Sequence, residues 1–206
     1  MKTITVGLTG ASGLPYGMRL IQSLLAAGCT VHVLYTQAAQ IVARQEMGFT
    51  WPGRAAELAD WMRAHFALAE ADAARLQVFG QQEWFAPMAS GSNPGDGMVV
   101  CPCTMGALAA IAGGASDNLL ERAADVMIKE NKKLILVPRE APFSALHLEN
   151  MLKLARLGVV ILPPNPGFYH HPQTIGDLVD FVVARILDQL AVPHQLMQRW
   201  GEETPE

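Results

Sequence analysis

Ile4-Thr-Val-Gly-Leu-Thr-Gly-Ala-Ser-Gly-Leu-Pro-Tyr-Gly17 is the stretch around which the rest of the chain is organised. Its apolar start, Ile4 to Leu8, predicts a strand buried on both faces. The run breaks at Thr9-Gly-Ala-Ser-Gly13, and helical spacing follows, with Pro15 tolerated in the first helical turn. A strand, a turn of small residues and a helix start together suit an anion, because the first N–H groups of a helix are unpaired and its dipole is positive there.

Two interpretations of this turn stay open. Gly10, Ala11 and Ser12 are small enough for a ligand to approach the backbone, and Ser12 can cap the helix or donate its hydroxyl to a phosphate. First turns of such sheets are the usual binding crevice. However, the glycine spacing is not Gly-x-Gly-x-x-Gly, and no Gly-Lys-Ser/Thr is present, so neither the dinucleotide fingerprint nor the P-loop is met. A phosphate-bearing ligand and an ordinary tight turn are therefore both possible on this stretch alone.

Composition limits the class of protein. A chain of 206 residues most simply forms one domain with one large core. Hydrophobic residues make up 50% and charged residues 17%, which favours a sheet buried on both faces together with surface hidden by oligomerisation. The net charge of -4 argues against a general nucleic-acid or anionic-membrane surface. There is no apolar run of about 20 residues and no signal-peptide pattern, and three cysteines suit a reducing cytoplasm, so we expect a cytoplasmic protein without a membrane span.

Strand and helix patterns alternate along the chain. They predict a single α/β domain over residues 1–192, doubly wound (Rossmann- or flavodoxin-like) with a mostly parallel sheet, and a polar tail over 193–206 that leaves its body. After the opening unit, strands are expected at 30–35, 76–79, 98–103, 133–137 and 159–162. Helices are expected at 37–46, 54–74, 118–130, 145–157 and 174–190, the third of these capped by Ser116 or Asp117.

One edge of this sheet gathers the candidate binding residues. In a parallel sheet the carboxyl ends of the strands meet at one edge, where ligands bind. Small and hydroxylated groups there suit a planar ligand that carries a phosphate, and the guanidinium of Arg139 suits a phosphate or a ring carbonyl. The alternative for Arg139 is a local ion pair with Glu140. The predicted edge consists of Gly10, Ala11, Ser12, Thr36, Thr104, Met105, Gly106, Ala107, Arg139, Glu140 and the proline-rich loop that contains Tyr169.

A second candidate set is basic. Arg122 and Lys129 lie seven residues apart and share a helical face, and Arg185 belongs to the last helix. Singly, each is an ordinary surface charge; together with Tyr169 they would hold a second phosphate as a leaving group. No Asp-Asp-x-x-Asp run is present to hold magnesium on a diphosphate. The histidines at 147, 170 and 171 lack metal-ligand spacing, so no metal is expected.

The loop over 81–97 contains Trp84, Phe85 and Met88. A loop of this length is either functional, or packed against a partner, or an Ω-loop whose aromatic residues pack on its own body. Both interpretations stay open. The Cys101-Pro-Cys103 pair is not a Cys-x-x-Cys motif, and we expect buried core thiols there.

At this point the sequence resembles a known family. Thr9-Gly-Ala-Ser-Gly13, Asn118-Leu-Leu-Glu-Arg-Ala-Ala-Asp125, Leu136-Val-Pro-Arg-Glu-Ala-Pro-Phe-Ser144 and Pro166-Gly-Phe-Tyr169 are similar to motifs of the UbiX-like flavin prenyltransferases. Cys101-Pro-Cys103, Leu148-Glu-Asn-Met-Leu152 and Leu178-Val-Asp-Phe-Val-Val-Ala-Arg185 extend the resemblance from about residue 4 to Trp200.

The resemblance implies an activity. Such enzymes join a dimethylallyl group from dimethylallyl monophosphate to N5 and C6 of reduced FMN, without a metal. The prenylated FMN then serves a separate UbiD-like decarboxylase, in ubiquinone synthesis or aromatic acid metabolism. FMN is a substrate in this reaction, and the family typically assembles as a dodecamer with its sites at subunit junctions.

The resemblance also implies roles for single residues. Gly10, Ala11, Ser12, Thr36, Arg139 and the stretch Thr104, Met105, Gly106 and Ala107 would contact FMN, although the family often has Ser-x-Lys-Thr in that stretch and the lysine is absent here. Lys129, Tyr169 and Arg185 would hold the donor phosphate, with Arg122 and Glu140 close by and Glu140 moving protons. Trp84 would form part of the prenyl pocket wall, and Glu46 corresponds to an acidic residue near it.

Two other classes share the flavin contacts. A peptidyl-cysteine decarboxylase would need a base at the flavin ring, typically a histidine, and would have no use for Tyr169 with Arg185. A flavin carrier without catalysis would not need the basic set.

Overall fold

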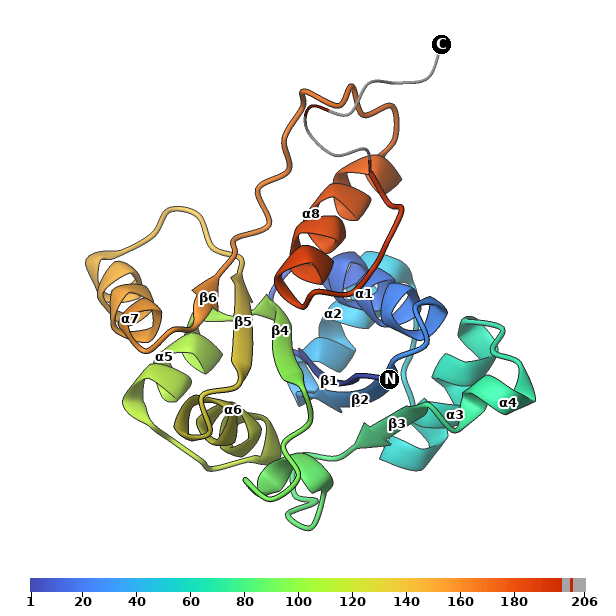
Figure 1. Ribbon diagram of the computed structural model, residues 1–206, viewed down its shortest axis with the longest axis horizontal. Coiled ribbons are helices and arrows are strands. Elements are labelled where there is room, and N and C mark those ends of the chain that lie inside the picture. Colours follow the sequence, from blue (N-terminus) through green and yellow to red (C-terminus); the bar gives the residue numbers. More distant parts are fainter. Residues whose placement is uncertain (198–200, 202–206) are drawn as a thin grey trace.

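A six-stranded parallel sheet lies at the centre of the computed structural model, which describes residues 1–197 and Gly201 (Figure 1). The strand order is β3-β2-β1-β4-β5-β6, and every neighbouring pair is parallel. The strands are β1 (Thr3–Leu8), β2 (Thr30–Tyr35), β3 (Leu76–Phe79), β4 (Gly97–Cys103), β5 (Lys133–Pro138) and β6 (Val160–Ile161). Since the chain runs outward from β1 and then returns to β4 beside it, the order reverses between these two strands, which is where open α/β sheets bind ligands.

Helices cover both faces of the sheet. Helices α1 (Leu14–Ala26), α2 (Gln37–Met47), α3 (Ala55–His65) and α8 (Ile175–Gln189) share one core cluster, to which β1 contributes Ile4, Val6 and Leu8. Helices α5 (Met105–Gly113), α6 (Leu119–Lys129) and α7 (Ala145–Arg156), with the short 3₁₀ helix η1 (Pro87–Ala89), form the second cluster on the other face. This arrangement confirms the predicted doubly wound α/β fold, and burial on both faces explains the apolar strands.

Helix α1 packs unusually close to the sheet. A Cβ atom added to Gly17 would lie 2.3 Å from the carbonyl oxygen of Cys101, in β4. No side chain is possible at that distance, so Gly17 lets the backbone of α1 rest directly on the strand that borders the switch point.

The long helix predicted over 54–74 is wrong. The chain forms α3 and a separate single turn, α4 (Glu70–Ala73), with Ala67 between them in the left-handed region at φ 48°. Arg63 fixes the break, because its guanidinium donates to the carbonyl oxygens of Ala73 at 3.2 Å and Leu76 at 3.0 Å. The chain thereby turns back to enter β3.

Smaller differences concern element ends. The predicted cap of α6 at Ser116 or Asp117 is wrong: Asn118 caps the helix, accepting from the Glu121 N–H at 3.0 Å. Strand β6 has two residues instead of the predicted four. The described start of the predicted tail does not leave the body, because Leu196 and Met197 pack against the first core cluster. Residues 198–200 and 202–206 lie outside the described residues, and the boundary at 192 stays a prediction.

No helix in the described part of the chain combines the length and apolarity that crossing a membrane requires.

Candidate functional site

The β1–α1 turn has the geometry of an anion cradle. Ala11 is buried and Ser12 exposed, and a Cβ atom at Gly10 would lie 2.3 Å from that of Ala38, so only glycine fits there. Among the described residues, the backbone N–H groups of Gly10, Ala11 and Ser12 have no hydrogen-bond acceptor. Three backbone donors at a strand end can therefore face a ligand.

The side chain of Glu46, which lies near the end of α2, contacts the N-terminus of α1. Its carboxylate accepts from the Gly13 N–H at 3.0 Å and from the Leu14 N–H at 3.1 Å. The expected cap by Ser12 does not form, and the N-cap position is Gly13, at φ 108°. The carboxylate thus satisfies the first helical donors and offsets the positive end of the dipole, which leaves the preceding turn, 10–12, to meet an external anion.

Thr9 links the two turns that flank the switch point. Its buried hydroxyl donates to the carbonyl oxygen of Pro102 at 2.7 Å and accepts from the Thr104 N–H at 2.9 Å. The Cys101–Pro102 peptide between these partners is cis. Thr9 was not among the candidate site residues predicted from the sequence, although a hydroxyl directly after a buried strand is a recognisable signal.

Thr36 and Thr104 cap the helices that follow β2 and β4. The Thr36 Oγ1 accepts from the Ala39 N–H at 3.2 Å, and the Thr104 Oγ1 accepts from the Ala107 N–H at 3.1 Å. Because each hydroxyl acts here only as an acceptor, its proton stays available for a ligand at the edge. After Thr104, Met105 is buried, while a Cβ atom at Gly106 would meet open space.

Arg139 and Glu140 follow β5 at the same edge. The Arg139 N–H donates to the carbonyl oxygen of Cys103 at 3.2 Å, which fixes the backbone beside the β4 turn. The two side chains are exposed and, among the described residues, Arg139 forms no ion pair; Glu140 instead accepts from the Ala141 N–H at 3.1 Å. The alternative of a local Arg139–Glu140 ion pair is therefore wrong, and the guanidinium is available to a ligand.

The basic set is divided between the two faces of the sheet. Arg122 and Lys129 belong to α6, whereas Arg185 belongs to α8 on the opposite face (Figure 1). Each cation pairs with an acidic neighbour: Arg122 with Asp125 at 2.8 Å, Arg185 with Asp188 at 2.6 Å, and Lys129 with Glu130. A single chain therefore does not bring the three cations together, and their shared role stays a prediction.

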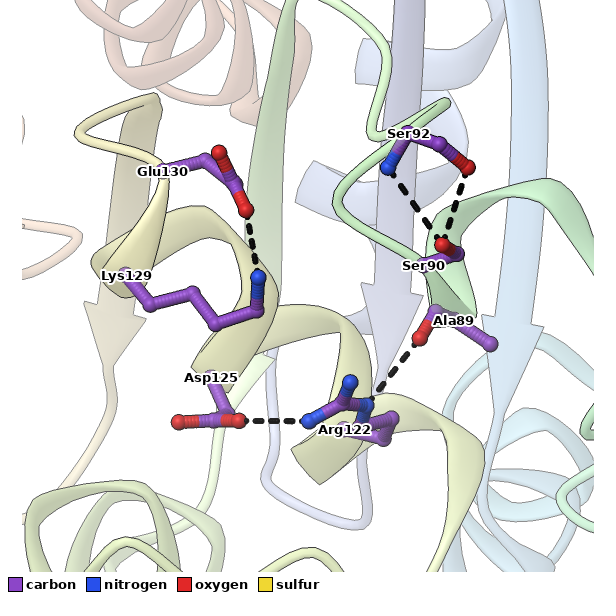
Figure 2. A network of polar contacts seen from close by, with 7 residues as sticks. All are labelled: Ala89, Ser90, Ser92, Arg122, Asp125, Lys129 and Glu130. Atoms are coloured by element: carbon purple, nitrogen blue, oxygen red, sulfur yellow. Dashed lines mark hydrogen bonds and ion pairs between the residues drawn. The ribbon is translucent and has the colours of Figure 1, made fainter.

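The loop that contains Ser90 and Ser92 lies beside Arg122 and Lys129 of α6 (Figure 2). The sequence did not indicate these two serines as part of a site. Arg122 donates through Nε to the carbonyl oxygen of Ala89 at 3.0 Å, and the hydroxyls of Ser90 and Ser92 contact each other at 2.9 Å. A Cβ atom at Gly91 would lie 2.7 Å from the Lys129 Nζ, so this loop passes directly over the ammonium group. Cations and small polar groups from two elements thus share one surface.

The loop over 81–97 is anchored at its start and exposes its aromatic residues. Gln81 accepts from the Leu119 N–H at 2.8 Å and donates through its side chain to the carbonyl oxygen of Tyr35 at 3.3 Å. Met88 is buried, but Trp84 is 41% exposed and Phe85 fully exposed. The interpretation in which these aromatic residues pack on their own body is therefore wrong for Trp84 and Phe85.

Tyr169 lies away from the α6 cations, in the loop before α8. Its ring is half exposed and makes edge contacts with Phe181 and His170, at centroid distances of 5.7 and 5.8 Å. His170 stacks on Phe181, and the His147 Nδ1 accepts from the Ser144 N–H at the start of α7. Among the residues that the structure describes, no three histidine, cysteine or acidic side chains gather as metal ligands.

At the sheet edge, Ser12, Arg139 and Glu140 are exposed. A hollow of about 520 Å³ lies elsewhere, between α1 and the start of α8, with Met18, Arg19 and Val179 in its wall. The thiols beneath the edge are free and buried, as expected, and burial raises the pKa of Cys101 and Cys103 well above the usual range. They can contribute packing but no nucleophile.

Fold and edge together define the class: this is a doubly wound α/β protein whose switch point offers hydrogen-bond donors to an anionic ligand. The Flavoprotein family model matches residues 1–187, and the chain belongs to that family. Comparison with curated relatives identifies the group within this family to which the chain belongs. The flavin prenyltransferase UbiX of Pseudomonas aeruginosa is 52% identical over 98% of this chain and 95% of its own, and that of Halalkalibacterium halodurans is 48% identical over 97% and 93%. The chain belongs to the UbiX flavin prenyltransferases and is a prenyltransferase that acts on FMN.

Two solved structures of similar proteins have the same fold as this chain over nearly its whole length. A dodecameric FMN-dependent UbiX-like decarboxylase from Escherichia coli O157:H7 has a TM-score of 0.83 and 41% identity, covering 97% of this chain and 100% of that one. AnUbiX in complex with FMN and dimethylallyl pyrophosphate has a TM-score of 0.85 and 36% identity, covering 98% and 99%. The peptidyl-cysteine decarboxylase EpiD, with a TM-score of 0.57 at 13% identity, shares the fold alone.

Proposed function

We propose that the chain transfers the dimethylallyl group of dimethylallyl monophosphate to N5 and C6 of reduced FMN. The observation that carries this proposal is that one sheet edge holds the backbone N–H groups of 10–12 and the guanidinium of Arg139, none of which has a partner among the described residues. Backbone donors at a strand end suit the terminal phosphate of FMN, and a planar guanidinium suits its ring carbonyls. Thr36, Thr104 and the stretch Met105, Gly106 and Ala107 would line the space between them.

The donor site would be built by several copies of the chain. Arg122 and Lys129 lie on the opposite face of the sheet from Arg185, so one chain alone cannot place all three on one phosphate. The E. coli relative is a dodecamer, and half of this chain's residues are hydrophobic. Association of copies would carry Arg185 and Tyr169 of one to the α6 cations of another. We therefore infer a dodecamer with its sites at subunit junctions.

A monophosphate donor would suit the proposed donor site. Cations and the Tyr169 hydroxyl would stabilise the departing phosphate without a metal. Trp84 would shield the prenyl group from water and present its π-face to developing positive charge. Glu140, exposed beside Arg139, would move the protons, and Glu46 would add an acidic group near the same turn.

The product would leave for another enzyme. Prenylated FMN would serve a UbiD-like decarboxylase, in ubiquinone synthesis or aromatic acid metabolism. Three free, buried thiols support a reducing cytoplasm as the place of this reaction.

The test is mass spectrometry of the flavin after anaerobic incubation of the full chain with reduced FMN and dimethylallyl monophosphate. We expect a flavin heavier by one C5 prenyl unit, formed equally well with a chelator present. A parallel incubation with the diphosphate tests the leaving group, because AnUbiX was crystallised with dimethylallyl pyrophosphate. Faster transfer from the diphosphate would overturn the monophosphate assignment alone, whereas unmodified flavin with both donors would overturn the whole proposal.

A further inference from the structure

Helix α7 has two apolar faces, and the protein buries only one of them. Met151 and Leu154 pack into the second core cluster, while Leu148 and Leu152 on the outward side are 53% and 51% exposed. The neighbouring Phe143, Leu146 and Leu157 are exposed as well. A helix at the margin of a sheet normally presents polar residues to water, so this outward side has the composition of a contact surface.

Among the residues that the structure describes, the charges on this outward side have no ion-pair partner. Glu149, Lys153 and Arg156 border Leu152 and share with it a hollow of about 360 Å³. Glu149 and Lys153 have the i,i+4 spacing that favours an ion pair, yet among the described residues neither they nor Arg156 form one. By contrast, arginines on α3 and α6 pair with acids three residues away.

We propose that α7 docks against α7 of a second copy of this chain, antiparallel, about a two-fold axis that passes between Leu152 and Lys153. Such an axis places residues at equal distances from it opposite each other. Glu149 then faces the partner's Arg156, and Arg156 faces the partner's Glu149, so one contact makes two ion pairs. Leu152 enters the hollow of the facing helix, and Leu148 covers the partner's Leu157.

Self-complementarity favours a second copy over an unrelated protein. The surface carries one acid, Glu149, before the central Leu152 and two bases after it, and a two-fold axis pairs this acid with the outer base, Arg156, of the facing copy. The E. coli relative, which is 41% identical to this chain, is a dodecamer and therefore an assembly in which similar chains contact one another. The segment 139–144, with Arg139 and Glu140, connects β5 directly to α7, so this contact would also hold the segment in place.

The experiment reverses charges one at a time and then together. Glu149→Arg and Arg156→Glu are made in the full chain, singly and as the double variant, and assembly is followed by native mass spectrometry and sedimentation velocity. Each single variant brings like charges together twice at the axis, so we expect the protein concentration at half-assembly to rise at least about tenfold. In the double variant each pair is restored with opposite polarity, and assembly should return toward that of the wild type.

Controls separate this contact from general effects. Glu70→Arg makes the same charge change on α4, at the other margin of the sheet, and should leave assembly unchanged. Leu152→Ser tests the apolar part and should weaken assembly while leaving the thermal midpoint of the isolated subunit unchanged, because this side chain is half exposed. A monomeric wild type, single reversals that assemble like the wild type, or a folded double variant that fails to recover would each overturn the proposal.

Discussion

The hydroxyl of Thr9 accepts a hydrogen bond of 2.9 Å from the backbone N–H of Thr104, joining the turn after β1 to the turn after β4. The same hydroxyl donates to Pro102, so both of its roles are used within the protein. Because the strand order reverses between β1 and β4, this one side chain sets the spacing of the two turns that face the proposed flavin.

Thr9→Val should therefore destabilise the protein and loosen the site. Valine has nearly the same shape, but it leaves the part-buried Thr104 N–H and the Pro102 carbonyl without this hydroxyl as a partner, at a cost of about 1–3 kcal/mol. Urea denaturation of the variant checks the stability, and FMN titration checks the affinity, which should fall. Thr9→Ser keeps the hydroxyl and should retain most of both properties; equal losses in the serine and valine variants would contradict the role assigned to the hydrogen bonds.

Glu46→Gln should separate two roles of one carboxylate. The amide retains an oxygen that can accept from Gly13 or Leu14 but loses the charge at the helix start, so unfolding free energy should fall by no more than about 1 kcal/mol. If Glu46 also acts near the prenyl site, as we propose, the single-turnover transfer rate should fall by a larger factor than this loss explains. Glu46→Ala should lose both stability and rate, and a glutamine variant with the wild-type rate would leave Glu46 with the structural role only.

The fold was predictable because its signals are local. Apolar runs broken by small residues gave the strands, and the resemblance to flavin prenyltransferases agreed with the curated relatives. The helix over 54–74 was not predictable, because propensity carries no information on the tertiary hydrogen bonds by which Arg63 ends α3. The same reason explains why the cap of α1 was missed: its acceptor, Glu46, lies 33 residues from Gly13.

The positions of Arg122, Lys129 and Arg185 relative to one another could not be predicted from the sequence, for a different reason. Spacing along α6 correctly suggested a shared helix for Arg122 and Lys129, but it could not say on which face of the sheet Arg185 would lie. In our proposal these residues meet only through contacts between copies, and the spacing of residues along one helix carries no information on such contacts. The residues assigned to the donor site therefore stay a prediction.

Arg185→Ala should weaken donor binding while sparing FMN. Removing a charged hydrogen-bond donor from a phosphate site raises the dissociation constant by roughly ten- to hundredfold. Calorimetric titration with dimethylallyl monophosphate, on protein preloaded with FMN, measures this change. Arg54→Ala is a matched control, because Arg54 also pairs with an acid three residues away but lies on an exposed helix start. Unchanged donor affinity in Arg185→Ala would remove Arg185 from the site.

The native protein should show no fast-reacting thiol. Cys29, Cys101 and Cys103 are free and at most 4% exposed, and burial raises the pKa of all three, that of Cys103 to about 12. The thiolate, which is the reactive form, is therefore scarce even at mildly alkaline pH. Titration with a disulfide reagent at pH 8 should label no cysteine until guanidinium is added, and then all three. Rapid labelling of the native protein would contradict the buried placement.

Stability should decline in mild acid through His32. This residue lies on β2, is 7% exposed and meets the ring edge of Phe79 at 5.4 Å; burial lowers its pKa from the ordinary value of 6.5. Between the folded pKa and 6.5 the unfolded chain binds more protons than the folded one, so the unfolding free energy falls as pH drops below 6.5 and is flat, for this group, above it. One group contributes at most about 1.4 kcal/mol per pH unit.

Urea denaturation at several pH values between 5 and 8 measures this slope. His32→Gln removes the titrating ring and should flatten the decline, whatever its effect on absolute stability. His171→Asn is the control, because His171 is exposed and its left-handed backbone, at φ 53°, is one that asparagine tolerates. The slope of this control should match the wild type. A decline that persists unchanged in His32→Gln would mean that other groups carry the acid sensitivity of the fold.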